Sequence, residues 1–366
     1  MEGASDPAAG RPDPVEALGE RLLLDAVGAL ELYTVYLGER LGLYRALAEG
    51  GATTSTGLAA RTGTAERYVR EWLEHHAASG LLEVDDPGAG PRERAYRLPP
   101  AHVPVLADPD DVRYQAHKGV ELVRAARPLP QLVEAFRSGA APPPLAWEPE
   151  GRAEFNRPLF VNLLGERWLP AIPAIDRRLR AEPRARVADV ACGTGWSSIA
   201  MARAYPAILV DGFDLDADVI AAARRNAAEA GVSERVAFSV TDASDPGLAG
   251  RYDVVTVFEA LHDLARPVDA LRAARAMLAS GGCVLVADEP VGDEFAAPVT
   301  SVQERLAYGW SVVSCLPGAM GDPRSAATGA VLRPPVLRAH AREAGLTGFE
   351  VLPLDVDFWR FYLLTP

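Results

Sequence analysis

The stretch "VADVACGTGWSS", residues 187–198, decides the fold of this chain. An apolar run typical of a buried strand leads into a turn with two glycines, Gly193 and Gly195, and a helical pattern follows the turn. Glycines here allow a tight turn and the close approach of a ligand, to which the helix offers its N-terminus. The turn alone fits several nucleotide-like ligands, so its neighbours must decide among them.

The turn lacks the residues that pyrophosphate-binding loops require. A dinucleotide fingerprint has a further glycine where this chain has Ser198, and a phosphate-binding loop has a lysine that is missing here. Neither kind of pyrophosphate ligand is therefore favoured.

From about residue 185, short apolar segments alternate with amphipathic helical segments. The strand-like segments are "ARVADVA", "AILVDGFD", "RVAFSV", "YDVVTVF" and "GCVLVAD". Nearly continuous apolar strands separated by helices indicate a parallel sheet that is covered on both faces. The sequence predicts a Rossmann-like, doubly wound α/β domain over residues 181–366.

Carboxylates accompany three of these strands: Asp189 precedes the glycines, Asp214 ends "GFDLD", and Asp242 follows "SVT". A carboxylate after the second strand suits a ribose, because it can accept from both hydroxyls, and Asp242 is placed to recognise an adenine amino group. Three acids at the ends of adjacent strands, beside the glycine turn, favour a ligand that carries hydrogen-bond donors and positive charge, such as S-adenosylmethionine. Taken singly, each acid, including Asp216, could instead be a solvated loop residue or a helix cap.

The motifs "VADVACGTG", "GFDLD", "VTDAS" and "FEALHD" resemble the successive cofactor-binding motifs of class I methyltransferases. The whole chain resembles bacterial, especially actinobacterial, methyltransferases with an N-terminal winged helix domain. The resemblance implies a seven-stranded sheet whose last strand is antiparallel, with "FEVLPL" and "DFWRFYLL" supplying the last two strands. It implies S-adenosylmethionine as cofactor, bound by Asp189, Ala191, Cys192, Gly193, Thr194, Gly195, Asp214, Leu215, Asp242, Ala243, Phe258 and Glu259.

The candidate catalytic residues are His262 and Glu289. His262 follows the fourth strand, and parallel-sheet enzymes work at the carboxyl ends of their strands. "FEALHDL" is similar to the "HDW" segment of hydroxyl O-methyltransferases, although Leu264 replaces the tryptophan, and Glu289 resembles the acid that orients the base. We predict in-line methyl transfer to a small molecule at a hydroxyl oxygen, with His262 as base. Alternatively, His262 caps the next helix or only lines the cofactor pocket.

The N-terminal region has the pattern of a winged helix domain over residues 15–104. After an initial helical period, the pattern predicts a short helix that stops at Gly63, a longer helix capped by Thr64, and a wing from "LLEV" and "AYRL". We expect a disordered tail over residues 1–14 and a helical connector over 105–180. An insertion over 291–334 is expected to form a lid, in which a helix bearing Leu306, Trp310 and Val313 covers the pocket; alternatively, these residues pack into the core.

Charge argues against nucleic acid as a partner. The net charge is −13, and the helix at the recognition position carries Glu66, Glu71 and Glu74, which oppose phosphate contacts. The resemblance instead implies a homodimer whose winged helix shapes the substrate pocket. The alternative function is a winged helix transcription regulator that senses S-adenosylmethionine or a related ligand.

Composition points to the cytoplasm. The three cysteines have no metal-type spacing, so we expect free thiols and no metal. The N-terminus lacks the pattern of a secretion signal, and the most apolar early stretch is interrupted by Asp25 and Glu31, so no membrane association is expected.

Overall fold

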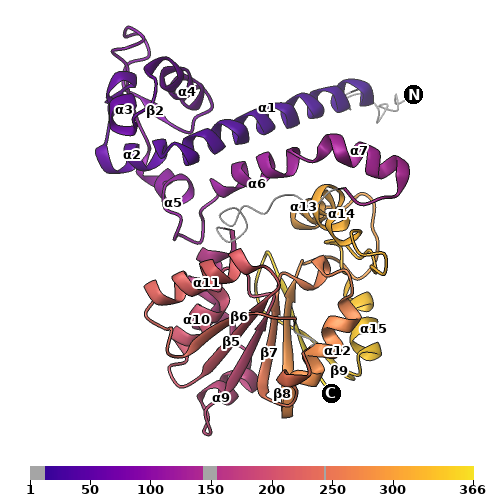
Figure 1. The fold of residues 1–366 in the computed structure, drawn as a ribbon. Coiled ribbons are helices and arrows are strands. Elements are labelled where there is room, and N and C mark those ends of the chain that lie inside the picture. Colours follow the sequence, from indigo (N-terminus) through magenta and orange to yellow (C-terminus); the bar gives the residue numbers. More distant parts are fainter. Residues whose placement is uncertain (1–12, 143–154, 243–244) are drawn as a thin grey trace, which may run out of the picture. The chain divides into compact units, whose positions relative to one another are not determined.

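The computed structural model describes residues 13–142, 155–242 and 245–366. It has two compact units, one ending at Arg124 and the other beginning at Ala125, so the predicted connector is divided between them (Figure 1). Ala243 and all but the last two residues of the predicted tail lie outside the described residues. Within the described ranges, no helix is long and apolar enough to cross a membrane.

The first unit is mainly helical and begins with a long helix, α1 (Pro14–Arg40). The Asp13 side chain caps it by accepting from the amide of Val15 at 3.1 Å. The helices that follow are α2 (Leu43–Gly50), α3 (Ser55–Thr62), α4 (Glu66–Ala78), the short η1 (Pro100–His102), α5 (Val103–Leu106) and α6 (His117–Ala126), of which the last two residues belong to the second unit.

A small antiparallel sheet completes the winged helix. Its strands β1 (Thr53–Thr54), β2 (Glu83–Val84) and β3 (Ala95–Arg97) have the order β1-β3-β2, and the predicted wing is confirmed. Gly63 ends α3 in the left-handed conformation, as predicted, with φ of 66°. The predicted cap of α4 was wrong: Ala65 holds that position, and the Thr64 hydroxyl instead pairs with the Thr62 hydroxyl at 2.8 Å.

The second unit contains a seven-stranded sheet with the order β6-β5-β4-β7-β8-β10-β9, which confirms the predicted fold class. Strand β10 runs antiparallel to both of its neighbours, β8 and β9. The strands are β4 (Arg186–Val190), β5 (Leu209–Asp214), β6 (Val236–Val240), β7 (Tyr252–Phe258), β8 (Leu278–Asp288), β9 (Gly348–Leu352) and β10 (Arg360–Thr365).

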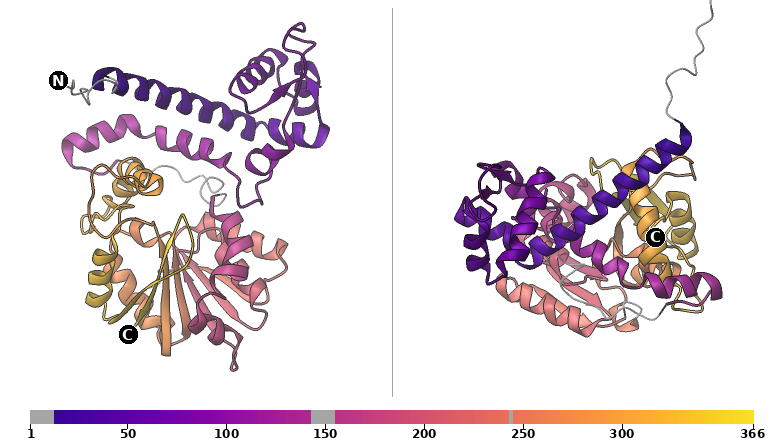
Figure 2. Two further views of the ribbon diagram at one scale, coloured as in Figure 1. Left: turned by 180° about the vertical axis from the view of Figure 1, so that it is seen from behind. Right: turned by 90° about the horizontal axis from the view of Figure 1, so that it is seen from above.

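Helices cover both faces of this sheet, because alternate strand residues are apolar on both sides. In β4, Val187 joins a core with α9 (Pro173–Arg180), α10 (Trp196–Ala204) and α11 (Ala217–Glu229). The next residue, Ala188, joins a second core with α12 (Pro267–Met277) and α15 (Pro334–Glu343). Figure 2 shows these two helical layers from behind and from above. The unit also contains α7 (Leu129–Ser138), the π-helical η2 (Phe160–Trp168), η3 (Pro246–Leu248) and η4 (Leu261–Asp263).

The insertion after β8 folds into α13 (Val302–Trp310), the π-helical η5 (Ser311–Cys315) and α14 (Leu316–Ala319). Leu306 of α13 is 47% exposed, so it is not a core residue, whereas Ala307 is buried against Val291 and Ala330. Arg333 ties the two ends of the insertion together. Its guanidinium donates to the Gly292 carbonyl at 2.6 Å and lies 3.1 Å from Glu304.

Candidate active site

The turn after β4 has the backbone geometry of a close-approach site. Gly193 and Gly195 have φ values of 54° and 84°, and a side chain at Gly195 would collide with the ring of Phe238. Ala191 and Glu259, at the ends of β4 and β7, also have positive φ, at 55° and 49°. Such strained residues cluster at functional sites, and here both border one cavity.

Asp189 is buried beneath this turn and is hydrogen-bonded to three neighbouring hydroxyl groups. Its carboxylate accepts from the hydroxyls of Ser197 at 2.5 Å, Ser198 at 2.6 Å and Thr256 at 2.7 Å. Burial raises the pKa of Asp189 above its ordinary value, while the three hydroxyl bonds act in the opposite direction. The carboxylate thereby joins β4, β7 and the start of α10. The serines were not predicted, although both lie within the quoted stretch.

Asp214, the last residue of β5, is held by two backbone amides. Its carboxylate accepts from Gly193 N and from Asp216 N, each at 3.1 Å. Asp216 itself caps α11 by accepting from Asp218 N at 2.8 Å and Val219 N at 3.2 Å. The helix-cap alternative is therefore correct for Asp216, while Asp214 is fixed beside the glycine turn.

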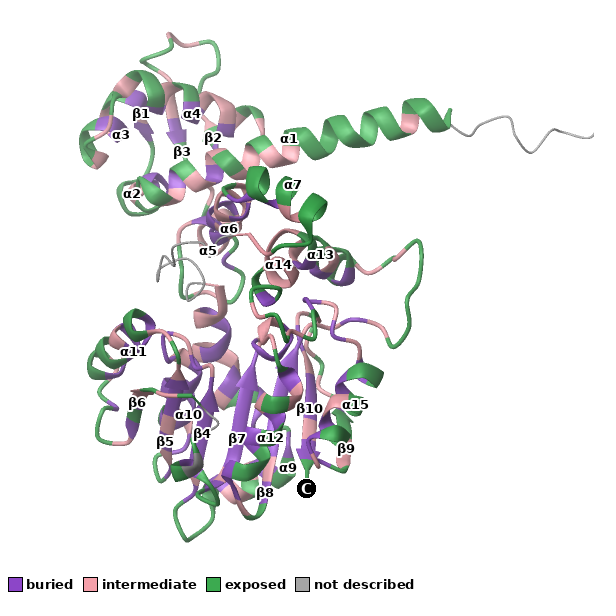
Figure 3. Ribbon diagram, turned by 45° about the vertical axis from the view of Figure 1, so that its right-hand side comes forward, coloured by how far each residue is buried: buried purple, intermediate pink, exposed green. Residues whose placement is uncertain are grey.

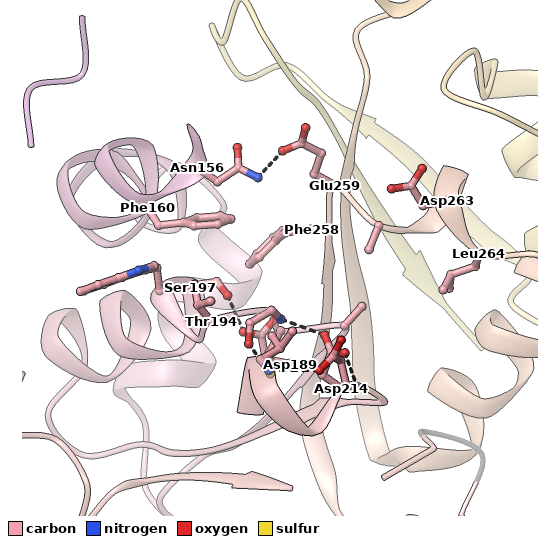
Figure 4. Close-up of a pocket in the computed structure, with 17 residues that line it drawn as sticks. Asn156, Phe160, Asp189, Thr194, Ser197, Asp214, Phe258, Glu259, Asp263 and Leu264 are labelled. Atoms are coloured by element: carbon pink, nitrogen blue, oxygen red, sulfur yellow. Dashed lines mark hydrogen bonds between the residues drawn. The ribbon is translucent and has the colours of Figure 1, made fainter. Parts of the chain in front are cut away.

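Two neighbouring cavities open at the carboxyl ends of the strands, and Ala191, Asp214 and Leu264 line both. The first, of about 370 Å³, is drawn in Figure 4. It is lined by Asn156, Phe160, Asp189, Ala191, Cys192, Gly193, Thr194, Trp196, Ser197, Asp214, Asp216, Val219, Phe258, Glu259, Ala260, Asp263 and Leu264. The second, of about 700 Å³, includes Leu215, Asp242, Arg266 and Arg272. Their sizes are those of small-molecule sites.

The structure thus brings most of the predicted cofactor residues to one place. Gly195 lines neither cavity, since it is the cap residue of α10 and lies against Phe238. Ala243 lies outside the described residues. Sequence reasoning missed Asn156, whose side-chain amide donates to Glu259 across the first cavity (Figure 4). These two residues are 103 positions apart, so no local pattern links them.

The buried His262, in η4, is held by a carboxylate that differs from the predicted one. Its Nδ1 lies 2.6 Å from Oδ1 of Asp288, the last residue of β8, so Asp288 and not Glu289 has the orienting position. Successive side chains of a strand point to opposite faces, and a one-residue error therefore selects the wrong acid. Burial alone lowers the pKa of His262, but Asp288, Cys315 and Asp263 together raise it well above its ordinary value.

Part of each unit matches a family model. Residues 187–282 match the family model "Methyltransferase domain", and residues 28–108 match "Rv2258c-like winged HTH domain". The human N-acetylserotonin methyltransferase structure, solved with S-adenosylmethionine, has a TM-score of 0.70 and 19% identity, covering 98% of this chain and 99% of that one. At this identity the likeness shows a common fold.

Curated relatives match part of the chain. The ubiquinone biosynthesis O-methyltransferase of Ralstonia nicotianae is 32% identical over 38% of this chain and 53% of its own length. The enzyme of that name from Pseudomonas aeruginosa strain LESB58 is 28% identical over 58% of this chain and 82% of its own length. The chain spans 24%, 53% and 53% of the first three curated relatives it matches.

Proposed function

We propose that this chain, a class I methyltransferase with an N-terminal winged helix domain and S-adenosylmethionine as its cofactor, methylates a hydroxyl oxygen of a small molecule. The observation that carries the proposal is the Asp288–His262 pair beside the strand-end cavity, where Asp263 and Leu264 directly follow the histidine. A histidine that is oriented by a carboxylate can act as the general base that accepts a hydroxyl proton.

The residues of the two cavities fit the cofactor by their chemistry. Each oxygen of Asp214 accepts one backbone hydrogen bond, and a carboxylate has about four acceptor positions, so it retains capacity for ribose hydroxyls. Leu215 is 72% exposed and Asp242 lies near it in the second cavity, a combination suited to an adenine face and its amino group. When bound, the cofactor supplies an electrophilic methyl group on a sulfonium.

In this mechanism the chain contributes positioning and one proton acceptor. The acceptor oxygen must lie in line with the methyl–sulfur bond, about 3–3.5 Å from the methyl carbon. Asp288 holds Nδ1 of His262 and leaves Nε2 to take the hydroxyl proton as the oxygen attacks. A base of this kind contributes about 10²–10⁴-fold to the rate.

The test is turnover on a panel of hydroxylated aromatic and metabolite acceptors, with S-adenosylhomocysteine and the methylated product measured by mass spectrometry. We expect O-methylation by the wild type and a loss of about 100-fold or more in His262→Ala, with cofactor affinity retained. Methylation at nitrogen or carbon would contradict the oxygen assignment. Full turnover by His262→Ala would contradict the base.

For the winged helix domain we propose homodimerisation in the cytoplasm. The N-terminal part of α1 carries a stripe of apolar side chains that would be expected to pack against a partner, yet they are largely exposed (Figure 3). The stripe consists of Val15, Leu18, Leu22, Leu23, Leu24, Val27 and Leu30. The stripe runs for about 22 Å at 1.5 Å per residue, and an apolar surface of this kind is typical of a protein interface. The resemblance to dimeric methyltransferases supports a second copy as the occupant.

The transcription-regulator alternative is disfavoured by the ion pairs of α4. Arg67 pairs with Glu71 at 2.5 Å and Arg70 with Glu66 at 3.3 Å, so these arginines are already partnered by carboxylates. Binding DNA phosphates would require breaking such pairs in a region where glutamates repel the backbone. We therefore propose no nucleic-acid partner.

A further inference from the structure

Three different metal-ligating side chains converge beside His262. A ring nitrogen of His262, a carboxylate oxygen of Asp263 and Sγ of Cys315 all lie within 4.8 Å of one another. Because Nδ1 is bonded to Asp288, Nε2 is the nitrogen that can serve as a ligand. We propose that these three side chains form a binding site for one thiophilic divalent cation of the zinc class. This site goes beyond the proposed methyl transfer and does not depend on it.

The donor set has the composition that zinc prefers. Imidazole nitrogen, thiolate sulfur and carboxylate oxygen are its usual ligands in proteins, and three protein ligands leave a fourth position for water or another molecule. The Nε2 of His262 lies 3.4 Å from Oδ1 of Asp263. Two ligands at about 2.0–2.2 Å in a tetrahedral arrangement are separated by nearly this distance.

Asp288 bonds the ring nitrogen of His262 that would not bind the metal. Asp288 is 1% exposed and bonds Nδ1 of His262 at 2.6 Å, which leaves Nε2 directed to the other two donors. A carboxylate on the far nitrogen of a metal-bound histidine fixes the ring and strengthens it as a ligand. The other Asp288 oxygen, Oδ2, is buried without a hydrogen-bond partner in the described structure, so negative charge is left beside the ring.

The charge of the cluster also fits a divalent cation. Two carboxylates, Asp263 and Asp288, and the Cys315 thiol surround one buried imidazole. A divalent cation with one thiolate and one carboxylate ligand is neutral, so only the charge of Asp288 remains, and the proton lost by the thiol passes to solvent on binding. Buried charges need such compensation.

The placement of Cys315 is a property of the fold. It is the last residue of the π-helical η5, and α14, which directly follows η5, contacts η4, the element that carries His262. Single π-helical turns occur frequently at functional sites. Cys315 is 53 residues from His262 in the chain, so the insertion brings the thiol to the histidine.

Metal binding would take the lone pair of Nε2 that the proposed base needs. The metal-bound form is therefore expected to be inactive in methyl transfer, which makes the site a regulatory one if the proposed function holds. Metal binding and activity are measured separately, so failure of one does not disguise failure of the other.

The test uses the full chain without an affinity tag, stripped with a chelator and then titrated with Co²⁺ alone. We expect one equivalent of Co²⁺ per chain, with a thiolate-to-cobalt charge-transfer band that Zn²⁺ removes by competition. Cys315→Ser should abolish the band, and Asp263→Asn should weaken Co²⁺ binding by at least about tenfold. Cys283→Ser, which alters another partly buried thiol of the same unit, is the matched control and should keep the band.

Wild-type protein that gives no charge-transfer band and retains no Co²⁺ after gel filtration would overturn the proposal, whatever the variants do. A band that persists in Cys315→Ser would overturn it as well. Circular dichroism of each variant identifies loss of folding, and Asp263→Asn tests the same site without altering the thiol.

Discussion

The Nδ1 atom of His262 lies 2.6 Å from Oδ1 of Asp288, and both side chains are buried. The histidine comes from the short η4 after β7, and the aspartate ends the adjacent strand β8. Neighbouring parallel strands thus bring the histidine that we propose as the base and the carboxylate that holds it to the same edge of the sheet.

Replacing Asp288 tests whether this contact positions the base. In Asp288→Asn the ring of His262 loses its charged partner, so we expect kcat to fall by about tenfold or more, with cofactor Kd changed less than about twofold. Glu289→Gln is the matched comparison, one residue further along the chain. Steady-state kinetics of the two variants decide between the carboxylates, and a larger loss at Glu289 would favour the assignment made from sequence.

Asp214 is expected to carry much of the cofactor affinity. Asp214→Ala removes a charged acceptor and also frees Gly193 N, so cofactor binding should weaken by about tenfold or more, from charged hydrogen bonds worth about 1.5–3 kcal/mol. Isothermal calorimetry measures the change. Asp211→Asn on the same strand is the control, because Asp211 pairs with Arg186 and lines neither cavity. Equal weakening by both variants would point to a general effect on the fold.

The winged helix domain should lose stability in acid through His76. This residue is fully buried against Tyr44 and Trp72, and burial, with a smaller contribution from His75, lowers its pKa to about 4. A lowered histidine pKa means that the unfolded chain binds the proton first. The free energy that the neutral side chain of His76 adds to the stability of the domain is therefore fully present above about pH 6.5. It is lost as the pH falls toward 4.

Urea denaturation of wild type and His76→Gln at pH 7 and pH 5 measures this effect. The stability difference between them should shrink by about 2 kcal/mol at the lower pH. A difference that stays constant would show that His76 does not titrate in this way. His117, whose pKa burial lowers to about 3, acts with the same sign in both proteins and cancels in the comparison.

The exposed stripe of α1 should be required for dimerisation. Leu22→Glu combined with Leu30→Glu places charge on side chains that are 57% and 61% exposed, so the isolated chain should still fold. Light scattering should give twice the chain mass for wild type and the single-chain mass for the double variant. Tyr68→Glu, at an 82% exposed apolar position on α4, is the control and should remain dimeric. A monomeric wild type would contradict the proposed interface.

Local patterns predicted the parts of the site that lie close together in sequence. The glycine turn, Asp214 and the cap at Asp216 follow from strand ends and helix starts, which are written in a few adjacent residues. The sequence pointed to Glu289, whereas the structure places Asp288 against His262, because the register depends on where β8 ends to within one residue.

Contacts between distant segments could not be predicted. Asn156 reaches Glu259 from the helical segment before η2, and Cys315 reaches His262 from the insertion, and in neither case does a periodicity connect the partners. Helix α13 shows the same limit, since Leu306 fits an amphipathic pattern but is 47% exposed. Tertiary packing determines which face of a helix is buried when the sequence pattern alone fits more than one.

Calorimetric titration of the wild-type chain with S-adenosylmethionine, in parallel with NAD, tests the central claim most directly. The claim is that the strand-end carboxylates and the glycine turn accept a sulfonium nucleoside and not a pyrophosphate. One S-adenosylmethionine per chain, with no heat from NAD, is the predicted result. Binding of NAD in place of S-adenosylmethionine, or of neither, would contradict the account.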